Sequence, residues 1–154
     1  MLERLYAKAK IQISRRVDVV LNAIVNPETM KNFFISWGSG EMTEGASVQW
    51  MFPEFSEKFE VKVMTVKPGD IRFTWGEGPE ETTVEIKIEY AGKDSSIVTV
   101  IESAKDNNEA GITWMRGNTE GWANFLACLK AWLEHNINLR KGAFDFMRKN
   151  EVGD

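Results

Sequence analysis

The sequence has very few of the side chains that most catalytic and metal sites require. Cys128 is the only cysteine and His135 the only histidine in 154 residues. A lone cysteine cannot form an intrachain disulfide or a CxxC site, and a lone histidine excludes His-based triads and zinc sites with several histidine ligands. The helical pattern places His135 near a helix end, away from the apolar face, and Cys128 on the border of that face. We therefore expect an exposed histidine, a buried packing cysteine, and neither a metal ion nor a cofactor.

Long apolar runs and an excess of positive charge are also missing. No segment approaches the ~18 consecutive apolar residues that span a bilayer, and residues 1–4 lack the charged-then-apolar layout of a signal peptide. The net charge of −4 argues against nucleic acid or an anionic membrane surface as the main partner. Because the chain cannot form an internal disulfide, a reducing compartment is favoured, and we predict a cytoplasmic protein.

Motifs for phosphate binding and for acid–base catalysis are incomplete. The glycine runs at 38–40 and 76–78 do not continue into the pattern that opens a phosphate-binding helix, so we interpret both as turns. Acidic pairs such as Glu80-Glu81 lie in predicted loops, where carboxylates are ordinarily solvated. No residue is therefore assigned a catalytic role, and an enzyme is the less favoured interpretation.

Alternating apolar and polar residues predict a series of strands. The pattern covers 5–13 and recurs in five later segments, at 48–52, 59–63, 71–75, 84–90 and 97–101. Short turn signals such as Pro68-Gly69-Asp70 separate the later strands, so neighbours must be antiparallel. The charged residues within the alternation indicate that each strand shows one face to water and buries the other.

Helical patterns lie before and after the run of strands. A short helix is predicted over 14–25 with Ser14 as its cap, and a second over 27–35 with Asn26 as N-cap and Pro27 at its first position. A loop is expected over 36–47. A long helix is predicted over 118–138, because its apolar residues share one face of a 3.6-residue repeat. The residues on this face are Trp122, Phe125, Leu126, Leu129, Leu133 and Ile137, and Trp132 lies at its edge. Met115, just before the predicted helix, continues the same face.

The long helix is the only predicted element that could cover the buried face of the sheet. The sequence therefore predicts an α+β fold in one domain over residues 1–154, with a curled antiparallel sheet of about six strands wrapped around the C-terminal helix. Small residues, Gly117, Gly121 and Cys128, border the apolar face of this helix. We expect them to let a strand approach closely, while bulky neighbours hold the sheet away and leave a cavity beside the N-terminal half of the helix.

Aromatic residues at inward strand positions and on the helix indicate what such a cavity would hold. Binding cavities for apolar molecules are lined by residues of this kind with a few polar anchors, although the same residues could instead fill a solid core. Asn118 is a candidate anchor, whereas strand parity places the other candidates, Arg72 and Thr74, on the outer face. The predicted lining residues are Trp50, Phe52, Phe59, Val61, Phe73, Trp75, Val84, Ile86, Ile88, Trp114, Asn118, Trp122 and Phe125.

The C-terminal stretch after Gly142 carries a small apolar cluster of Phe144, Phe146 and Met147. It could fold back on the body of the protein or form an interaction surface. Basic residues beside it follow the predicted helix, where they suit the negative end of the helix dipole. These residues are Arg140, Lys141, Arg148 and Lys149.

Several short motifs match, in order, those of a known superfamily. They are Val20-Leu21-Asn22-Ala23-Ile24, Asn26-Pro27-Glu28, Phe73-Thr74-Trp75, Thr82-Thr83-Val84 and Gly121-Trp122. With these motifs, residues 11–133 resemble the SRPBCC or helix-grip superfamily of START domains, birch-pollen allergens and polyketide cyclases. Within it, the chain is similar to the group related to the activator of the heat-shock-protein ATPase. Two departures are Leu21, where members commonly carry an aromatic residue, and a longer, more polar connection from Ala104 to Trp114.

The resemblance implies a helix-grip fold, and it leaves three functions open. The first is non-catalytic binding of a small hydrophobic or lipid molecule between the sheet and the long helix. The second is a protein-interaction role as a cofactor of a chaperone ATPase. The third is an enzyme of the cyclase or hydrolase type, against which the scarcity of histidine and cysteine counts.

Overall fold

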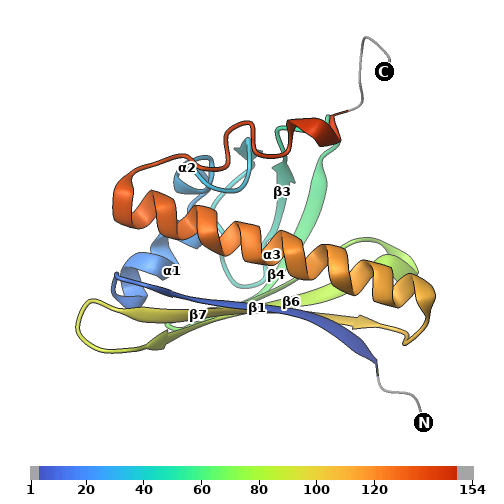
Figure 1. Ribbon diagram of the computed structural model, residues 1–154, viewed down its shortest axis with the longest axis horizontal. Helices are drawn as coiled ribbons and strands as arrows, with labels where there is room; N and C mark the ends of the chain where they lie inside the picture. Colours follow the sequence, from blue (N-terminus) through green and yellow to red (C-terminus); the bar gives the residue numbers. More distant parts are fainter. Residues whose placement is uncertain (1–3, 149–154) are drawn as a thin grey trace.

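The computed structural model describes residues 4–148, in which a seven-stranded antiparallel sheet curls around a long C-terminal helix (Figure 1). The strand order is β1-β7-β6-β5-β4-β3-β2, so every pair of neighbours except β1 and β7 is also adjacent in the sequence. The predicted α+β helix-grip fold is confirmed. The first three residues and Lys149, on which two of the sequence predictions depend, lie outside the described residues.

The sheet follows the predicted alternation closely. Its strands are β1 (Leu5–Ile13), β2 (Trp37–Gly38), β3 (Ser47–Met51), β4 (Phe59–Lys67), β5 (Asp70–Trp75), β6 (Thr82–Tyr90) and β7 (Ser96–Lys105). The two-residue strand β2 is an addition within the stretch predicted to be loop. Between β4 and β5, Gly69 has a φ of +83°, and a Cβ there would lie 2.9 Å from the carbonyl oxygen of Ile88. Only glycine fits this turn without strain.

Two short helices follow β1, as predicted, but with different ends. Helix α1 (Val17–Val25) begins after Arg16, which makes no side-chain capping bond, so the prediction of Ser14 as the cap is wrong. Helix α2 (Pro27–Met30) has the predicted cap, since Asn26 Oδ1 accepts from the backbone N–H of Glu28 at 2.9 Å. It ends five residues before the predicted end, and turns carry the chain onward through two buried residues, Phe33 and Ile35.

Helix α3 (Glu109–His135) begins nine residues earlier than predicted. Asn108 caps it by accepting from the N–H of Gly111 at 2.8 Å, a signal hidden in a polar stretch that we interpreted as loop. The connection from β7 to α3 is therefore only residues 106–108, and the predicted long connection is wrong. Asn136 ends the helix in the left-handed conformation with a φ of 54°. Ile137 consequently lies beyond the helix and is exposed rather than part of its apolar face.

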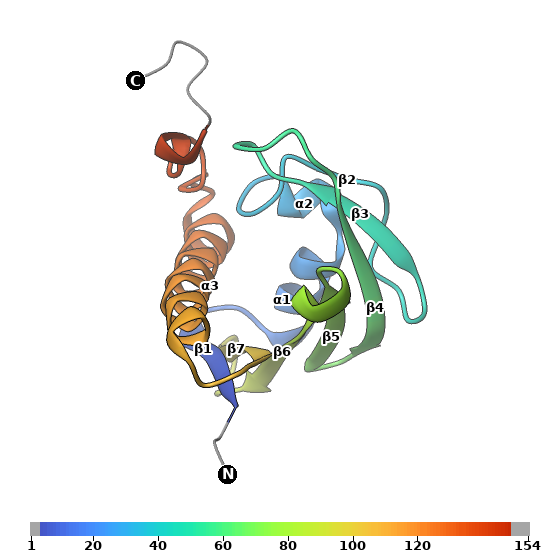
Figure 2. The same ribbon diagram turned by 90° about the vertical axis from the view of Figure 1, so that its right-hand side faces the viewer.

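The sheet curves so that its inner face meets α1 and α2, while α3 lies across the open side above β1 and β7 (Figure 2). Leu126 and Leu129 of α3 are at most 1% exposed and join Ile24 of α1 in the core. The N-terminal half of α3 extends past these helices, over the end of the sheet where β5, β6 and β7 carry their own inward side chains. Within residues 4–148, no helix has both the length and the apolar character that crossing a membrane requires.

Candidate functional site

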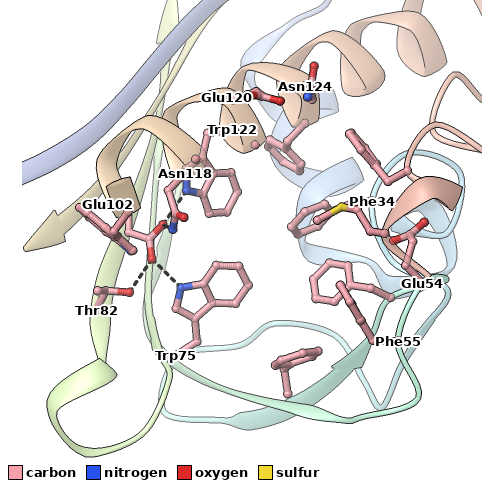
Figure 3. A pocket seen from close by; sticks show the side chains of 18 of the residues that line it. Phe34, Glu54, Phe55, Trp75, Thr82, Glu102, Asn118, Glu120, Trp122 and Asn124 are labelled. Atoms are coloured by element: carbon pink, nitrogen blue, oxygen red, sulfur yellow. Dashed lines mark hydrogen bonds between the residues drawn. The ribbon is translucent and has the colours of Figure 1, made fainter. Parts of the chain in front are cut away.

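A cavity of about 630 Å³ lies between α3, the inner face of the sheet and the C-terminal segment 136–148 (Figure 3). We call it the aromatic cavity, after the side chains that form most of its walls. The sheet and its connections contribute Phe52, Glu54, Phe55, Phe59, Trp75, Gly76, Glu80, Thr82, Glu102 and Lys105. The lining is completed by Phe34, by eight residues of α3 and by four residues of the C-terminal segment.

The aromatic walls are a continuous set of ring contacts. Phe34 is central to it, with ring centroids 4.6 Å from Phe125, 5.1 Å from Phe52 and 5.8 Å from Trp122. Trp75 on β5 faces Trp122 on α3 across the cavity end at 5.7 Å. Tilted and edge-to-face arrangements of this kind are the favoured ones for aromatic pairs, so the walls hold their shape without a ligand.

One end of the aromatic cavity is organised by a buried carboxylate. Glu102 on β7 is 1% exposed, and it accepts four hydrogen bonds. Its Oε2 accepts from Trp75 Nε1 at 2.9 Å and from the hydroxyl of Thr82. Its Oε1 accepts from Asn118 Nδ2 and from Trp122 Nε1, each at 2.8 Å (Figure 3). We call these five residues the Glu102 cluster.

The Glu102 cluster is a structural junction as well as part of the cavity wall. Its members come from β5, β6, β7 and α3, so the carboxylate connects the helix to three strands. A carboxylate offers about four lone-pair positions, and all of them are occupied here. Glu102 therefore has no free position to accept a proton-bearing group of a substrate without losing an internal bond. It also fixes the orientation of the indole rings of Trp75 and Trp122, which form the adjacent wall.

The opposite end of the aromatic cavity contains a buried ion pair. Arg140 donates to both oxygens of Glu54, at 2.7 and 2.6 Å, and these side chains are 11% and 2% exposed. The guanidinium also lies 4.6 Å from the ring centroid of Phe144. The pair joins the β3–β4 connection to the C-terminal segment, so this segment folds back over the cavity. Arg140 follows the end of α3, as predicted, and it also has a carboxylate partner that the sequence did not indicate.

The rim of the aromatic cavity is formed by α3 and by a more exposed ion pair. Lys105 Nζ lies 3.1 Å from Glu80 Oε2, and the Glu80 side chain is 79% exposed, as expected for a solvated loop carboxylate. Gly117 and Gly121 line the rim, and a Cβ at either position would have no heavy atom within 4 Å. The expectation that these glycines let a strand approach is therefore wrong. The glycine of α3 in tight contact is Gly111, where a Cβ would overlap the carbonyl oxygen of Asp106.

The structure divides the predicted lining residues into two groups. Those that line the aromatic cavity are Phe52, Phe59, Trp75, Trp114, Asn118, Trp122 and Phe125. The remaining ones lie in the closed core beneath it: Trp50, Val61, Phe73, Val84, Ile86 and Ile88. Trp50 is 1% exposed and packs on Phe73 and Trp75, and its indole nitrogen has no hydrogen-bond partner among the described residues. Of the proposed anchors, Arg72 pairs with Glu85 on the outer face, as strand parity indicates.

The three buried charged residues of the cavity, Glu54, Glu102 and Arg140, were not predicted as lining residues from the sequence. Glu102 has a signal, because it continues the inward alternation of Val98 and Val100 on β7. A carboxylate at an inward position requires partners, and that alone marks it as unusual. Glu54 and Arg140 lie on irregular segments 86 residues apart, and no periodic pattern connects them.

Cys128 and His135 lie where the sequence predicts. Cys128 is 3% exposed, and burial raises the pKa of its thiol, which is the opposite of what a reactive thiolate needs. His135 is an exposed residue in the last turn of α3. Within residues 4–148, no group of three or more His, Cys, Asp or Glu side chains is placed to hold a metal ion.

A family model matches residues 15–134, which is more than half of the chain, and its description is Activator of Hsp90 ATPase homolog 1-like protein. No curated protein matches the chain.

Several solved structures share the fold. The protein SSP2350 from Staphylococcus saprophyticus is 27% identical with a TM-score of 0.77, over 88% of this chain and 96% of that one. DynU16, a protein in the dynemicin biosynthetic locus, is 25% identical with a TM-score of 0.74, over 86% of this chain but only 48% of its own. Aha1 from Colwellia psychrerythraea, solved as a dimer, is 20% identical with a TM-score of 0.72, over 85% and 97% of the two chains. At that identity the likeness concerns the fold alone.

Proposed function

The chain belongs to the family of Activator of Hsp90 ATPase homolog 1-like proteins, and we propose that it binds a small hydrophobic molecule in the aromatic cavity without catalysing a reaction. The observation that carries this proposal is the cavity of about 630 Å³, which is within the range of small-molecule sites. Its walls are mainly aromatic, and its two buried carboxylates, Glu54 and Glu102, are already bonded to other residues of the protein. Such a site favours retention of an apolar molecule over chemistry on it.

The arrangement of the carboxylates supports binding rather than catalysis. A general acid or base must reach the substrate proton with an available lone pair or proton. Glu102 is saturated by four internal donors, and Glu54 is bound through both oxygens to Arg140. Each carboxylate therefore has a structural role that a catalytic step would disrupt.

Native mass spectrometry of the protein purified from its own host tests this proposal. We expect a species heavier than the chain by the mass of one small molecule, which is released on denaturation. A ligand should also raise the apparent stability, because it binds the folded state only. A homogeneous apo mass, together with no thermal shift from any apolar compound of a diverse set, would contradict the proposal.

A second candidate is a protein-interaction role with a chaperone ATPase. The family description supports it, since the family is named for an activator of the Hsp90 ATPase. The test is a pull-down of the chaperone from the same host, followed by its rate of ATP hydrolysis with and without this protein. Co-purification and a changed rate would support this role, and the absence of both would remove it.

A further inference from the structure

The charged residues around the aromatic cavity indicate the chemistry of its ligand. The acidic lining residues are Glu54, Glu80, Glu102 and Glu120, and the basic ones are Lys105 and Arg140. Both basic side chains are engaged in ion pairs, one with Glu54 and the other with Glu80. Among the lining residues that the structure describes, Glu102 and Glu120 therefore contribute negative charge that no basic side chain offsets.

The charge of Glu102 is the more influential of the two, because it is buried. Its hydrogen-bond partners among residues 4–148 are two indoles, an amide and a hydroxyl, all of them neutral. None of these donors carries a positive charge, so no basic side chain among them offsets the carboxylate. In a partly buried site the effective dielectric constant is far below that of water, so a ligand beside this cluster experiences the charge strongly.

The same lining offers little to an anionic ligand. Carboxylates and phosphates are best recognised by the free fork of an arginine or by an available ammonium group. Arg140 uses two of its guanidinium nitrogens on Glu54, in a pair that is almost fully buried. Lys105 pairs with Glu80 and lies 6.0 Å from the ring centroid of Trp114. An anionic head group would have to share one of these cations with a carboxylate that already offsets its charge.

The aromatic walls favour a cationic ligand, as do the two carboxylates that have no basic partner. The faces of tryptophan and phenylalanine rings carry negative potential, and they attract cations within about 6 Å. Trp75 and Trp122 form the wall immediately beside Glu102, and both indole N–H groups point at its carboxylate (Figure 3). A cationic group at this end would therefore be attracted through space by a carboxylate whose lone pairs stay with their internal donors, and by the aromatic faces.

We propose that the ligand of the aromatic cavity is an apolar molecule with a cationic head, such as a protonated amine, and that the head lies at the Glu102 end. This inference rests on the proposed function, because it specifies the ligand class of the same cavity. It differs from that function in one measurable respect. A simple hydrophobic cavity would accept cationic, neutral and anionic molecules of the same shape in order of their apolar area alone.

The test is competition against a neutral fluorescent probe, N-phenyl-1-naphthylamine, near neutral pH. Displacement is compared for three molecules with the same ten-carbon chain: decylamine, decanol and decanoate. We expect decylamine to displace the probe at a concentration about tenfold or more below that of decanoate, with decanol between them, and the difference to shrink at high salt. Equal potency of all three, or decanoate as the strongest, overturns the inference while probe binding still supports the proposed function.

Variants that each remove one negative charge show which carboxylate attracts the cationic head. Glu102→Gln should reduce the advantage of decylamine over decanol about fivefold, and Glu120→Gln at the rim should reduce it by a smaller factor. Glu89→Gln makes the same charge change on the exposed face of β6 and should leave the advantage unchanged. If Glu102→Gln does not fold, Glu120→Gln and the salt dependence decide the matter. An unchanged advantage in both of these measurements overturns the inference, and failure of the probe to bind the unmodified protein counts against the proposed function itself.

Discussion

The aromatic cavity has a buried carboxylate at each end, and the two are stabilised in different ways. Glu54 is paired with a guanidinium, whereas Glu102 has no basic partner and is held by four neutral donors. The Glu54–Arg140 pair joins two irregular segments outside the strands and α3, which we expect to separate more easily, while the Glu102 cluster joins α3 to three strands. The difference indicates that the cost of breaking a buried polar contact depends on whether the segments it joins can separate, so that the freed polar group reaches water.

The largest expected effect is at the rigid end. Glu102→Leu removes the acceptor of two indole N–H groups and one amide, and leucine offers no acceptor in its place. Since each buried unsatisfied donor costs roughly 1–3 kcal/mol, we expect the free energy of unfolding to fall by about 3 kcal/mol. Urea denaturation measures it, with exposed Glu89→Gln as the control, expected within about 0.5 kcal/mol of the unmodified protein. A loss below about 1 kcal/mol in Glu102→Leu would mean that the cluster can relax.

A pair of glycine substitutions compares the closed side of α3 with its cavity side. Both Gly111→Ala and Gly121→Ala gain about 0.8 kcal/mol of helix propensity. At Gly111 the new Cβ would lie 1.9 Å from the Asp106 carbonyl oxygen, whereas at Gly121 it would meet nothing within 4 Å. We expect Gly111→Ala to destabilise the protein by about 2 kcal/mol through overpacking, and Gly121→Ala to stabilise it by up to about 1 kcal/mol. Thermal denaturation of the two variants side by side decides this, and equal shifts would refute the assigned packing.

Breaking the ion pair at the movable end should cost less. Arg140→Met leaves Glu54 without its partner, which costs about 3–5 kcal/mol where neither group can reach water. Because the C-terminal segment can release the carboxylate to solvent, we expect a loss of only about 1 kcal/mol in global stability. Hydrogen exchange should instead become faster in residues 136–148 while α3 stays protected. Lys141→Met, at an exposed neighbouring position, is the control. Faster exchange in α3 as well would show that the two ends are equally rigid.

The smallest expected effect is at a partly buried pair on α3, Lys130 and Glu134, which provides a reference for the two buried carboxylates. The hydrogen bond from Lys130, with a second from the backbone N–H of Ser14, lowers the pKa of Glu134 below its ordinary value of 4.5. A lowered folded-state pKa stabilises the protein above 4.5, and that contribution is lost as the pH falls through the folded-state pKa. Glu134→Gln should therefore cost about 0.5 kcal/mol at neutral pH and nothing in strong acid. Denaturation curves at both pH values test this, and a constant difference would contradict it.

Most of the fold could be predicted from the sequence, because the alternation of apolar and polar residues shows which side chains of a strand face the core. The strands from β3 to β7 and the covering helix follow from it, as does the Asn26-Pro27 start of α2. Helix α3 was predicted too short because its first turns lack an apolar face, and only the Asn108 cap marks their start.

The cavity was less predictable, since two of its determinants are relations between distant segments. The strand alternation identifies Trp75 as an inward residue, and the helical repeat does the same for Trp122. Neither pattern can distinguish a residue that lines the cavity from a core residue such as Phe73, because the two differ only in whether another element packs against the side chain. The Glu54–Arg140 pair depends on how the C-terminal segment returns, and no local pattern specifies that path.

The central claim is that the space beside α3 is a binding cavity, and filling it tests this most directly. Gly121→Leu introduces a side chain at the rim where no atom lies within 4 Å, and Gly40→Leu makes the same change at an open position outside the cavity. Titration with N-phenyl-1-naphthylamine should show one saturable site in the unmodified protein and in Gly40→Leu. The affinity should be weaker by about tenfold or more in Gly121→Leu at unchanged folding. No saturable binding to the unmodified protein, or equal affinity in all three, would contradict the account.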